Sequence, residues 1–493
     1  MALANSPEVR SARRCARRGL VEPRRRAARA IALGGVGLAL FVTAPALGAT
    51  FTVNSTLDSS DGSCSSAAGG CTLREAIEAA VGMSGRDTID FDASVFSAGA
   101  DAVRIKLGSA LPVIADPAGT AVIGTGASVR IDGSNAVANG LLLASAPGVP
   151  LGRVTVANVA VEGFTRHGIQ ICGGYPPECD ADVSGALVRN VVAITNGGSG
   201  IFITGRVNKR PRVIDSVTFQ SGEDGIRVHG SQSMLGARVE GCTASRNGRS
   251  GIVLAAEEQT DSVVTDSFGL KSDNDGIAVN DDGMTVEPKV TNAVAWKNNN
   301  GIAVRSVALT AATISNSVAT GNAAHGVVVG SDDGKDAVLT RVTSDSNVSY
   351  GIFLDGLGTG GRVMGARVVG NEGFAIHTDA EIDLSVKDAL VAANYGGIEL
   401  SGMDGVVERS NSSGNYYGSG VAISGDGNTV IDNLTLGNGT YAFGVWVEMG
   451  TGNTITANVA QGNGIDLYDN NDDCGGNAWS DNIYLTGNPS CVH

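Results

Sequence analysis

The feature that most constrains this chain is an internal repeat of about 25 residues, in which a Gly is followed by Ile or Val. From Gly225 to Gly351 the steps between these anchors are 26, 25, 25, 25 and 25 residues. Such a period indicates a solenoid, whose units bury their apolar faces only by stacking on one another. The anchors are Gly168, Gly200, Gly225, Gly251, Gly276, Gly301, Gly326, Gly351, Gly397, Gly420, Gly444 and Gly464, with Ala375 in the same place once.

Each unit follows the pattern x-V-x-x-S-x-A-x-x-N-x-x-x-G-I-x-V, which predicts two short alternating strands separated by polar turns. The chain is 42% hydrophobic but only 4% aromatic, as expected of a core built from small aliphatic ladders. Its 70 glycines are expected in turns. The expected inward ladder pairs are Ile226/Val228, Ile252/Leu254, Ile277/Val279, Ile302/Val304, Val327/Val329 and Ile352/Leu354. We therefore predict an all-β, right-handed parallel β-helix.

Two other repeat architectures fit the sequence less well. Leucine-rich repeats have a similar length, but here the ladder is Val and Ile, and no stretch between anchors has helical periodicity. A β-propeller needs four strands in ~40 residues, so the units are too short.

Asn recurs four residues before the anchor, and the unpaired Cys242 occupies a ladder position of the repeat. Asn tolerates left-handed backbone and its amide can bond the next coil, so an asparagine ladder at the bends is predicted. Cys242 falls where a later unit has Ser317, which indicates a small structural residue. The Asn positions are Asn196, Asn247, Asn322, Asn347 and Asn371.

Residues 1–46 have the order of a secretory signal peptide: an Arg-rich stretch, an apolar run from Ile31 to Val42, and small residues. Cleavage is expected after Ala46 or after Gly48. The apolar run is short for a transmembrane helix, so no membrane insertion is expected. A secreted, extracellular or cell-surface location follows from this interpretation.

Charge and cysteine usage agree with export. Beyond residue 46 the chain has 26 basic and 48 acidic residues, a formal net charge of −22, which makes nucleic acid an unexpected partner. Six cysteines form three close pairs, and we expect disulfides by proximity, although sequence does not fix connectivity. Their spacing does not suit zinc, and five scattered histidines make no metal site. The pairs are Cys64/Cys71, Cys172/Cys179 and Cys474/Cys491.

A set of short motifs follows the signal. They are Thr52-Val53-Asn54-Ser55-Thr56, Asp61-Gly62, Cys64, Cys71-Thr72-Leu73-Arg74-Glu75-Ala76-Ile77-Glu78-Ala79, Asp87-Thr88-Ile89-Asp90-Phe91 and Ile131-Asp132-Gly133. Together these motifs resemble the N-terminal CSLREA domain of secreted bacterial β-helix proteins. They depart from the name motif only at Thr72, where the family has Ser. The resemblance implies architecture and export rather than a reaction.

Both ends of the solenoid are expected to be covered, because unpaired strand edges invite aggregation. Thr72 and Glu75 have the spacing of a capping box that begins a short amphipathic helix extending through Ala80. The tail from Asp472 to Cys491 is similar to the closing segment of such proteins. The expected domains are a signal (1–46), an N-terminal cap (47–125), β-helix repeats (126–470) and a C-terminal cap (471–493).

Outward positions of the repeat carry the candidate catalytic residues Asp224, Asp275 and Asp282. Asp224 and Asp275 would lie two coils, or ~10 Å, apart, just beyond the ~6.5–9.5 Å of inverting glycosidases. Turns favour Asp for structural reasons too. The substrate-binding candidates are His229, Arg305 and Tyr350.

The predicted fold resembles pectate lyases and polygalacturonases, but their motifs do not transfer. Arg104-Ile105-Lys106 lies far upstream of Asp281-Asp282, and neither His167 nor His229 has Gly on both sides. A lyase reading would imply Ca²⁺; no other cofactor is expected. Fold alone does not assign function.

Two hypotheses therefore remain. The first is a monomeric secreted or cell-surface protein that binds extracellular glycans, polysaccharides or other cell surfaces. The second is a polysaccharide lyase or glycoside hydrolase acting on an anionic polysaccharide. Exposed aromatic side chains beside carboxylates would favour either one, and turnover would separate them. The aromatic candidates are Trp296, Trp446, Tyr350, Phe353, Tyr416 and Tyr417.

Overall fold

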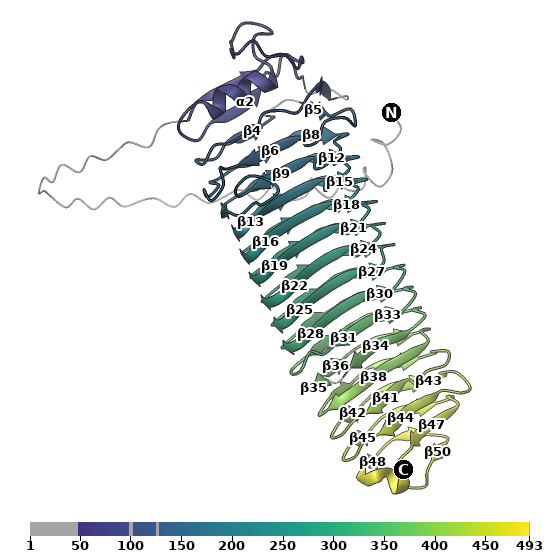
Figure 1. Ribbon diagram of the computed structural model, residues 1–493. Helices are drawn as coiled ribbons and strands as arrows, with labels where there is room; N and C mark the ends of the chain where they lie inside the picture. The colour runs from purple at the N-terminus through teal and green to yellow at the C-terminus, as the bar shows by residue number, and fades with distance from the viewer. Residues whose placement is uncertain (1–47, 98–101, 125–127, 380, 493) are drawn as a thin grey trace, which may run out of the picture.

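The computed structural model describes residues 48–97, 102–124, 128–379 and 381–492, and shows one solenoid of stacked coils (Figure 1). Residues 1–46, the expected signal, lie outside the described residues. Three parallel sheets run along the solenoid and are called sheets 1, 2 and 3. Over the described residues they hold 17, 16 and 17 strands, from β1 (Thr50–Val53) to β48 (Ala478–Ser480), from β3 (Val103–Lys106) to β49 (Ile483–Tyr484), and from β6 (Leu141–Ala144) to β50 (Gly487–Asn488).

Each coil has three strands rather than the two that the repeat pattern predicts. One representative coil consists of β17 (Arg238–Glu240), β18 (Thr243–Ser245) and β19 (Ile252–Thr260). Gly241, with φ 64°, lies between the first two and turns the chain from sheet 1 to sheet 2. The buried residues Val239 and Cys242 are therefore three positions apart, where a continuous strand would space inward residues by two.

The aliphatic ladders form as expected and make the core. Ile226, Ile252, Ile277, Ile302 and Val327 are register partners on consecutive strands of sheet 3, and all are fully buried. Burying one such side chain stabilises the fold by ~1.5–3 kcal/mol. Because each coil contributes the same layers, the core is one continuous column.

The anchor glycines have a different role from the expected one. Neither Gly225 nor Gly301 has a positive φ; a Cβ on Gly301 would lie 2.4 Å from the carbonyl oxygen of Gly326 in the next coil. The same close approach occurs at Gly225, where the Gly251 oxygen would lie 2.7 Å from the added Cβ. Glycine is therefore required by close packing between coils, not by a left-handed turn.

The asparagine ladder is present and is buried. The side-chain oxygen of Asn371 accepts hydrogen bonds from the backbone N–H (3.0 Å) and the amide (2.8 Å) of Asn347, and Asn371 donates to Asn394 in the same way. The expectation of left-handed backbone at these residues is wrong. The residue with positive φ is the one before each Asn, such as Ser346 before Asn347 and Gly370 before Asn371. The Asn side chain itself points inward and bonds the Asn of the next coil.

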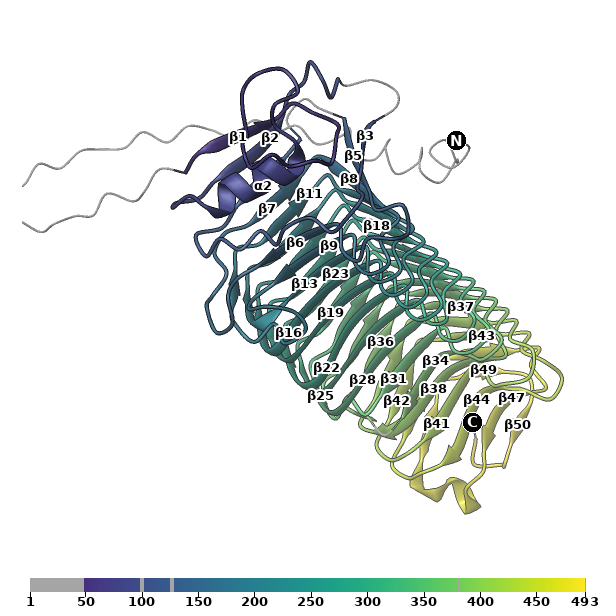
Figure 2. The same cartoon turned by 45° about the horizontal axis from the view of Figure 1, so that its top comes forward.

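The N-terminal end is covered by helix α2 (Leu73–Val81), which lies over the first coils (Figure 2). The Thr72 hydroxyl accepts a hydrogen bond from the Glu75 N–H and the Glu75 carboxylate accepts one from the Thr72 N–H, so the predicted capping box forms. Leu73 and Ile77 join the core of the solenoid. Thr72 therefore serves as the N-cap of this helix through its hydroxyl.

Three disulfides join Cys64 to Cys71, Cys172 to Cys179, and Cys474 to Cys491, the same pairs that proximity in sequence suggests. At the C-terminal end the Trp479 indole N–H donates to Asp469 at 3.0 Å, which ties the last coil to its neighbour. Strands from both expected caps pair with the adjacent coils. Across the described residues no helix has the length and apolarity needed to cross a membrane.

Cys242 is fully buried and not bonded to another cysteine. The Ser267 hydroxyl of the next coil bonds its backbone N–H at 3.2 Å, so the two residues occupy one ladder. Burial raises the pKa of the Cys242 thiol to about 12. The structure thus confirms a small ladder residue rather than a reactive thiol.

Candidate functional site

The outer face of sheet 3 carries a cavity and a group of aromatic rings. Its middle strands are β25 (Ile302–Thr310), β28 (Val327–Lys335), β31 (Ile352–Asp355), β34 (Phe374–Asp379) and β38 (Gly396–Met403). On these strands, the residue after each inward Ile or Val points outward. In-register pairing therefore stacks Val328, Phe353 and His377 in one outward row along the axis.

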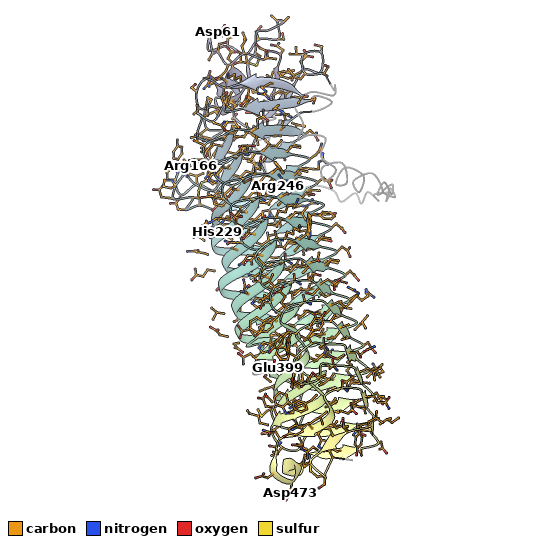
Figure 3. The ribbon with its side chains drawn as sticks, turned by 90° about the vertical axis from the view of Figure 1, so that its right-hand side faces the viewer. Asp61, Arg166, His229, Arg246, Glu399 and Asp473 are labelled. Carbon is orange, nitrogen blue, oxygen red and sulfur yellow. A yellow bond between two sulfur atoms is a disulfide. The ribbon has the colours of Figure 1, made fainter. Side chains whose placement is uncertain are left out.

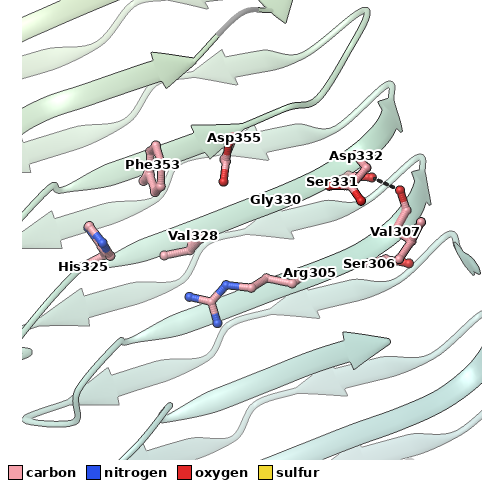
Figure 4. A pocket seen from close by; sticks show the side chains of 10 residues that line it. All are labelled: Arg305, Ser306, Val307, His325, Val328, Gly330, Ser331, Asp332, Phe353 and Asp355. Atoms are coloured by element: carbon pink, nitrogen blue, oxygen red, sulfur yellow. Dashed lines mark hydrogen bonds between the residues drawn. The ribbon is translucent and has the colours of Figure 1, made fainter. Parts of the chain in front are cut away.

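A cavity of about 310 Å³ opens on this face (Figure 4). Val328 forms its floor, with the rings of His325 and Phe353 on one side, and Arg305 and Asp355 bring opposite charges to its edge. Ser306, Val307, Gly330, Ser331 and Asp332 complete the lining. The cavity therefore offers an apolar floor, aromatic walls and polar groups of both signs, which is the usual make-up of a small-molecule site.

Four rings lie beside this cavity and form what we call the aromatic cluster: His325, Tyr350, Phe353 and His377. Tyr350 stacks on His377 with ring centroids 4.4 Å apart, and on His325 at 5.2 Å. Phe353 lies 5.3 Å from Tyr350 and 5.4 Å from His377. Four partly exposed rings from three consecutive coils thus form one contiguous cluster, and two of them, His325 and Phe353, line the cavity.

Carboxylates border the aromatic cluster. Glu399 and the Nδ1 of His377 are 2.6 Å apart, with both side chains about one-fifth exposed. Burial raises the pKa of the Tyr350 phenol, and the carboxylates of Glu399 and Asp379 raise it further. Burial lowers the pKa of His325, with Arg305 and His377 adding to the effect, so its ring is neutral near pH 7.

The candidate catalytic aspartates are engaged in structural contacts. Asp224 is 3% exposed; one of its oxygens accepts from the Ser250 N–H at 3.0 Å, and the other contacts Arg227 at 3.1 Å. Asp275 is buried as well and accepts from the Asn300 amide at 2.9 Å. The side chain of Asp282 lies outside the described residues. Asp224 and Asp275 therefore both make hydrogen bonds to the next coil, and Asp275 also lies 3.7 Å from Arg305 of the cavity.

The binding candidates are divided by the structure. Arg305 lines the cavity and Tyr350 lies in the aromatic cluster, so these two belong to one site. His229 lies several coils away from Glu399 along the axis (Figure 3), with its Nδ1 3.4 Å from the Thr204 hydroxyl. The same coils bring in His377, Glu399 and Asp355, which the sequence interpretation missed.

The missed residues His377 and Glu399 had a sequence signal. Like the expected aromatic candidate Phe353, each lies two residues after an anchor, namely Ala375 and Gly397 for the missed pair and Gly351 for Phe353. Collecting this position from every unit places Phe353, His377 and Glu399 in one outward row. The outward carboxylate candidates came instead from the position before the anchor. Within the described part of the chain, no three His, Cys, Asp or Glu residues are grouped to hold a metal ion.

These features define a parallel β-helix protein with a cavity on one sheet that is lined in part by aromatic rings. Residues 179–338 match the family model for a right handed beta helix region, which supports the predicted handedness. A comparison with curated proteins gives no match. The chain is similar in structure to the mannuronan C-5 epimerase AlgE4 A-module of Azotobacter vinelandii, with 14% identity, a TM-score of 0.32, and coverage of 85% of this chain and 94% of that one.

Two further solved structures show a likeness of the same degree. The periplasmic alginate epimerase AlgG is 12% identical, with a TM-score of 0.31 and coverage of 76% of this chain and 78% of that one. The Agl-KA catalytic domain is 15% identical, with a TM-score of 0.32 and coverage of 78% and 64%. At these identities no activity passes from those proteins to this chain.

Proposed function

We propose that this chain is an exported protein that binds a polysaccharide along the outer face of sheet 3. The observation that carries the proposal is the aromatic cluster, four rings with centroids 4.4 to 5.4 Å apart beside a cavity of about 310 Å³. Flat rings offer large apolar contact at low entropic cost, and the polar groups of Arg305 and Asp355 can bond hydroxyl groups. A sugar ring has both kinds of surface.

The linear shape of the site favours a polymer over a single sugar. The outward row on sheet 3 continues beyond the cluster to Trp446 and Tyr468, which are register partners on later coils. Phe443 and Tyr468 stack there at 4.7 Å. Since neighbouring coils are ~4.8 Å apart, successive units of one extended chain can contact successive coils.

Export belongs to the same proposal. Three disulfides support it, because such bonds persist in oxidising compartments outside the cytosol. In this proposal residues 1–46 are the signal and the 47–125 segment is a cap of the CSLREA type. Mass analysis of the protein from culture medium should give a chain that begins after Ala46 or Gly48, and an intact N-terminus in the cytosol would contradict export.

Binding is tested with the full exported chain and a panel of pectate, alginate, glycosaminoglycans and neutral glucans. We expect at least one polymer to bind, and Tyr350→Ala and Phe353→Ala each to weaken binding about tenfold, a loss of about 1.4 kcal/mol. Tyr441→Ala is the matched control, because Tyr441 is 86% exposed and lies outside the cluster. Absence of binding across the panel, or equal loss in the control, would refute the proposal.

An enzyme acting on the bound polysaccharide is the second candidate function, and one specific contact favours it. The contact between Glu399 and Nδ1 of His377 holds the imidazole in place, so that a ring with its proton on Nδ1 would present Nε2 as a general base. Incubation of each polymer with and without Ca²⁺ should release product that His377→Gln abolishes while binding persists. Product formation unaffected by His377→Gln would exclude this centre.

A further inference from the structure

A basic segment interrupts the acidic surface of the solenoid. Residues 206–212 read Arg-Val-Asn-Lys-Arg-Pro-Arg, in a chain whose formal net charge is −15. Asp182 pairs with Arg206 at 2.9 Å and with Lys209 at 3.2 Å, which neutralises part of the segment. Among the ion pairs of the described residues, none includes Arg210 or Arg212. Two guanidinium groups are therefore left without an acidic partner.

These two groups line a cavity of about 330 Å³ together with Gly236, Arg238 and Asp261. The cavity lies where the chain enters sheet 1. The corner residues of three consecutive coils, Arg210, Gly236 and Asp261, have φ of 53°, 63° and 52°. The middle corner has no side chain, so the space between Arg210 and Asp261 stays open.

Charge inside this cavity is unbalanced. Arg212 and Arg238 are register partners on adjacent parallel strands, β14 (Arg212–Ile214) and β17, ~4.8 Å apart. Like charges placed directly opposite each other on neighbouring strands destabilise a sheet. The carboxylate of Asp261 lies 3.3 Å from Arg238 and also 3.7 Å from Lys289, so it is shared between two cations. The cavity therefore retains a net positive charge.

We propose that this cavity, the Gly236 cavity, binds a tetrahedral oxyanion: a sulfate or phosphate, free or as an ester group on a glycan. Guanidinium groups donate pairs of hydrogen bonds to such anions, and three of them converge here. Arg210, Arg212 and Arg238 supply the donors, and Asp261 orients Arg238. The site is on sheet 1, so it does not depend on the polysaccharide site proposed on sheet 3.

Gly236 offers a direct test, because an Asp at this position would place its carboxylate in the cavity where the oxyanion is proposed to bind. A Cβ at this position would contact Arg210 Cγ at 3.7 Å, an ordinary distance, and Asp and Asn tolerate a φ of +63°. Gly236→Asp should abolish sulfate binding and raise Tm at low salt relative to Gly236→Asn, which fills the same space without charge. Equal Tm values for the two variants would overturn the electrostatic basis of the proposal.

Binding itself is measured by calorimetry on the full chain at low ionic strength, with sodium sulfate and inorganic phosphate as probes and sodium chloride at matched ionic strength as reference. Arg212→Gln should weaken sulfate binding at least tenfold. Arg362→Gln should leave it unchanged, because Arg362 occupies the same outward row of sheet 1 several coils away. If chloride bound as tightly as sulfate, or if Arg212→Gln left sulfate binding unchanged, the proposal would be overturned.

A sulfated oligosaccharide and its desulfated form identify the source of the oxyanion. Tighter binding of the sulfated form than of inorganic sulfate supports an ester group on a glycan as the ligand. Equal affinity for inorganic sulfate and the sulfated form supports a site for the free ion. Equal binding of the desulfated form would contradict an oxyanion site. Tm values of all variants check that the coils remain folded.

Discussion

Replacing Asn371 by Ala should destabilise the solenoid far more than most substitutions in turns do. The side chain is 1% exposed and makes four hydrogen bonds of 2.8 to 3.0 Å, two through its oxygen and two through its amide. Alanine removes the acceptor of the Asn347 backbone N–H and the amide donor to the Ser344 carbonyl. Each buried group left without a partner costs ~1–3 kcal/mol, so the expected loss is ~2–6 kcal/mol.

The loss is measured as a shift in the denaturant midpoint at constant slope, together with hydrogen exchange at the Asn347 amide. That amide should exchange about tenfold faster for each 1.4 kcal/mol lost. Asn299→Ala is the control, since Asn299 is exposed, and its change should stay within ~0.5 kcal/mol. Asn371→Asp should be at least as harmful as Ala, because a carboxylate would face the Ser344 and Asn394 oxygens. A loss below ~1 kcal/mol for Asn371→Ala would refute this account.

Three further perturbations test other parts of the structure. Gly326→Ala places a Cβ in conflict with the Ser344 side chain and should lower stability by ~1–3 kcal/mol in chemical denaturation, whereas an unchanged midpoint would contradict the close approach. Burial lowers the pKa of His167 from 6.5 to about 4, so the unfolded chain binds more protons between these values. Stability should therefore fall as pH drops from 6.5 to 4, and His167→Gln should flatten this dependence. The Cys242 thiol, with a pKa of about 12, should react with a maleimide only in denaturant, and labelling of the folded protein would show that the ladder opens.

The fold was predictable because the same pattern of inward and outward residues recurs in every unit of the repeat. A ladder position such as that of Ile252 recurs in every unit, so its inward direction follows from alternation alone. The third strand was missed because its corner, at Gly241 and its equivalents, differs in residue type from coil to coil. Gly, Asp, Asn and Arg all occupy it, and only the three-residue spacing of Val239 and Cys242 marks it in the sequence.

The candidate site was harder to predict, because it depends on side-chain contacts between coils. Tyr350 and Arg305 were identified as outward residues, but their relation to Glu399 depends on the register over several coils. Asp224 and Asp275 looked suitable for catalysis by type and spacing. Only the structure shows that both carboxylates accept hydrogen bonds from the next coil. Sequence supplies the position of a side chain on the coil, but not its partner.

The anchors from Gly251 to Gly351 are evenly spaced, so one whole unit can be removed and the two coils that then meet still place equivalent residues opposite each other. Excision of residues 301–325 would bring Gly276 to face Gly326, and Ile277 to face Val327, so close approach and ladder would both be preserved. A gene encoding such a chain can therefore lengthen or shorten by whole coils through duplication or deletion. The length of the solenoid can therefore change between related proteins, whereas its cross-section is fixed by the glycines and asparagines of each coil.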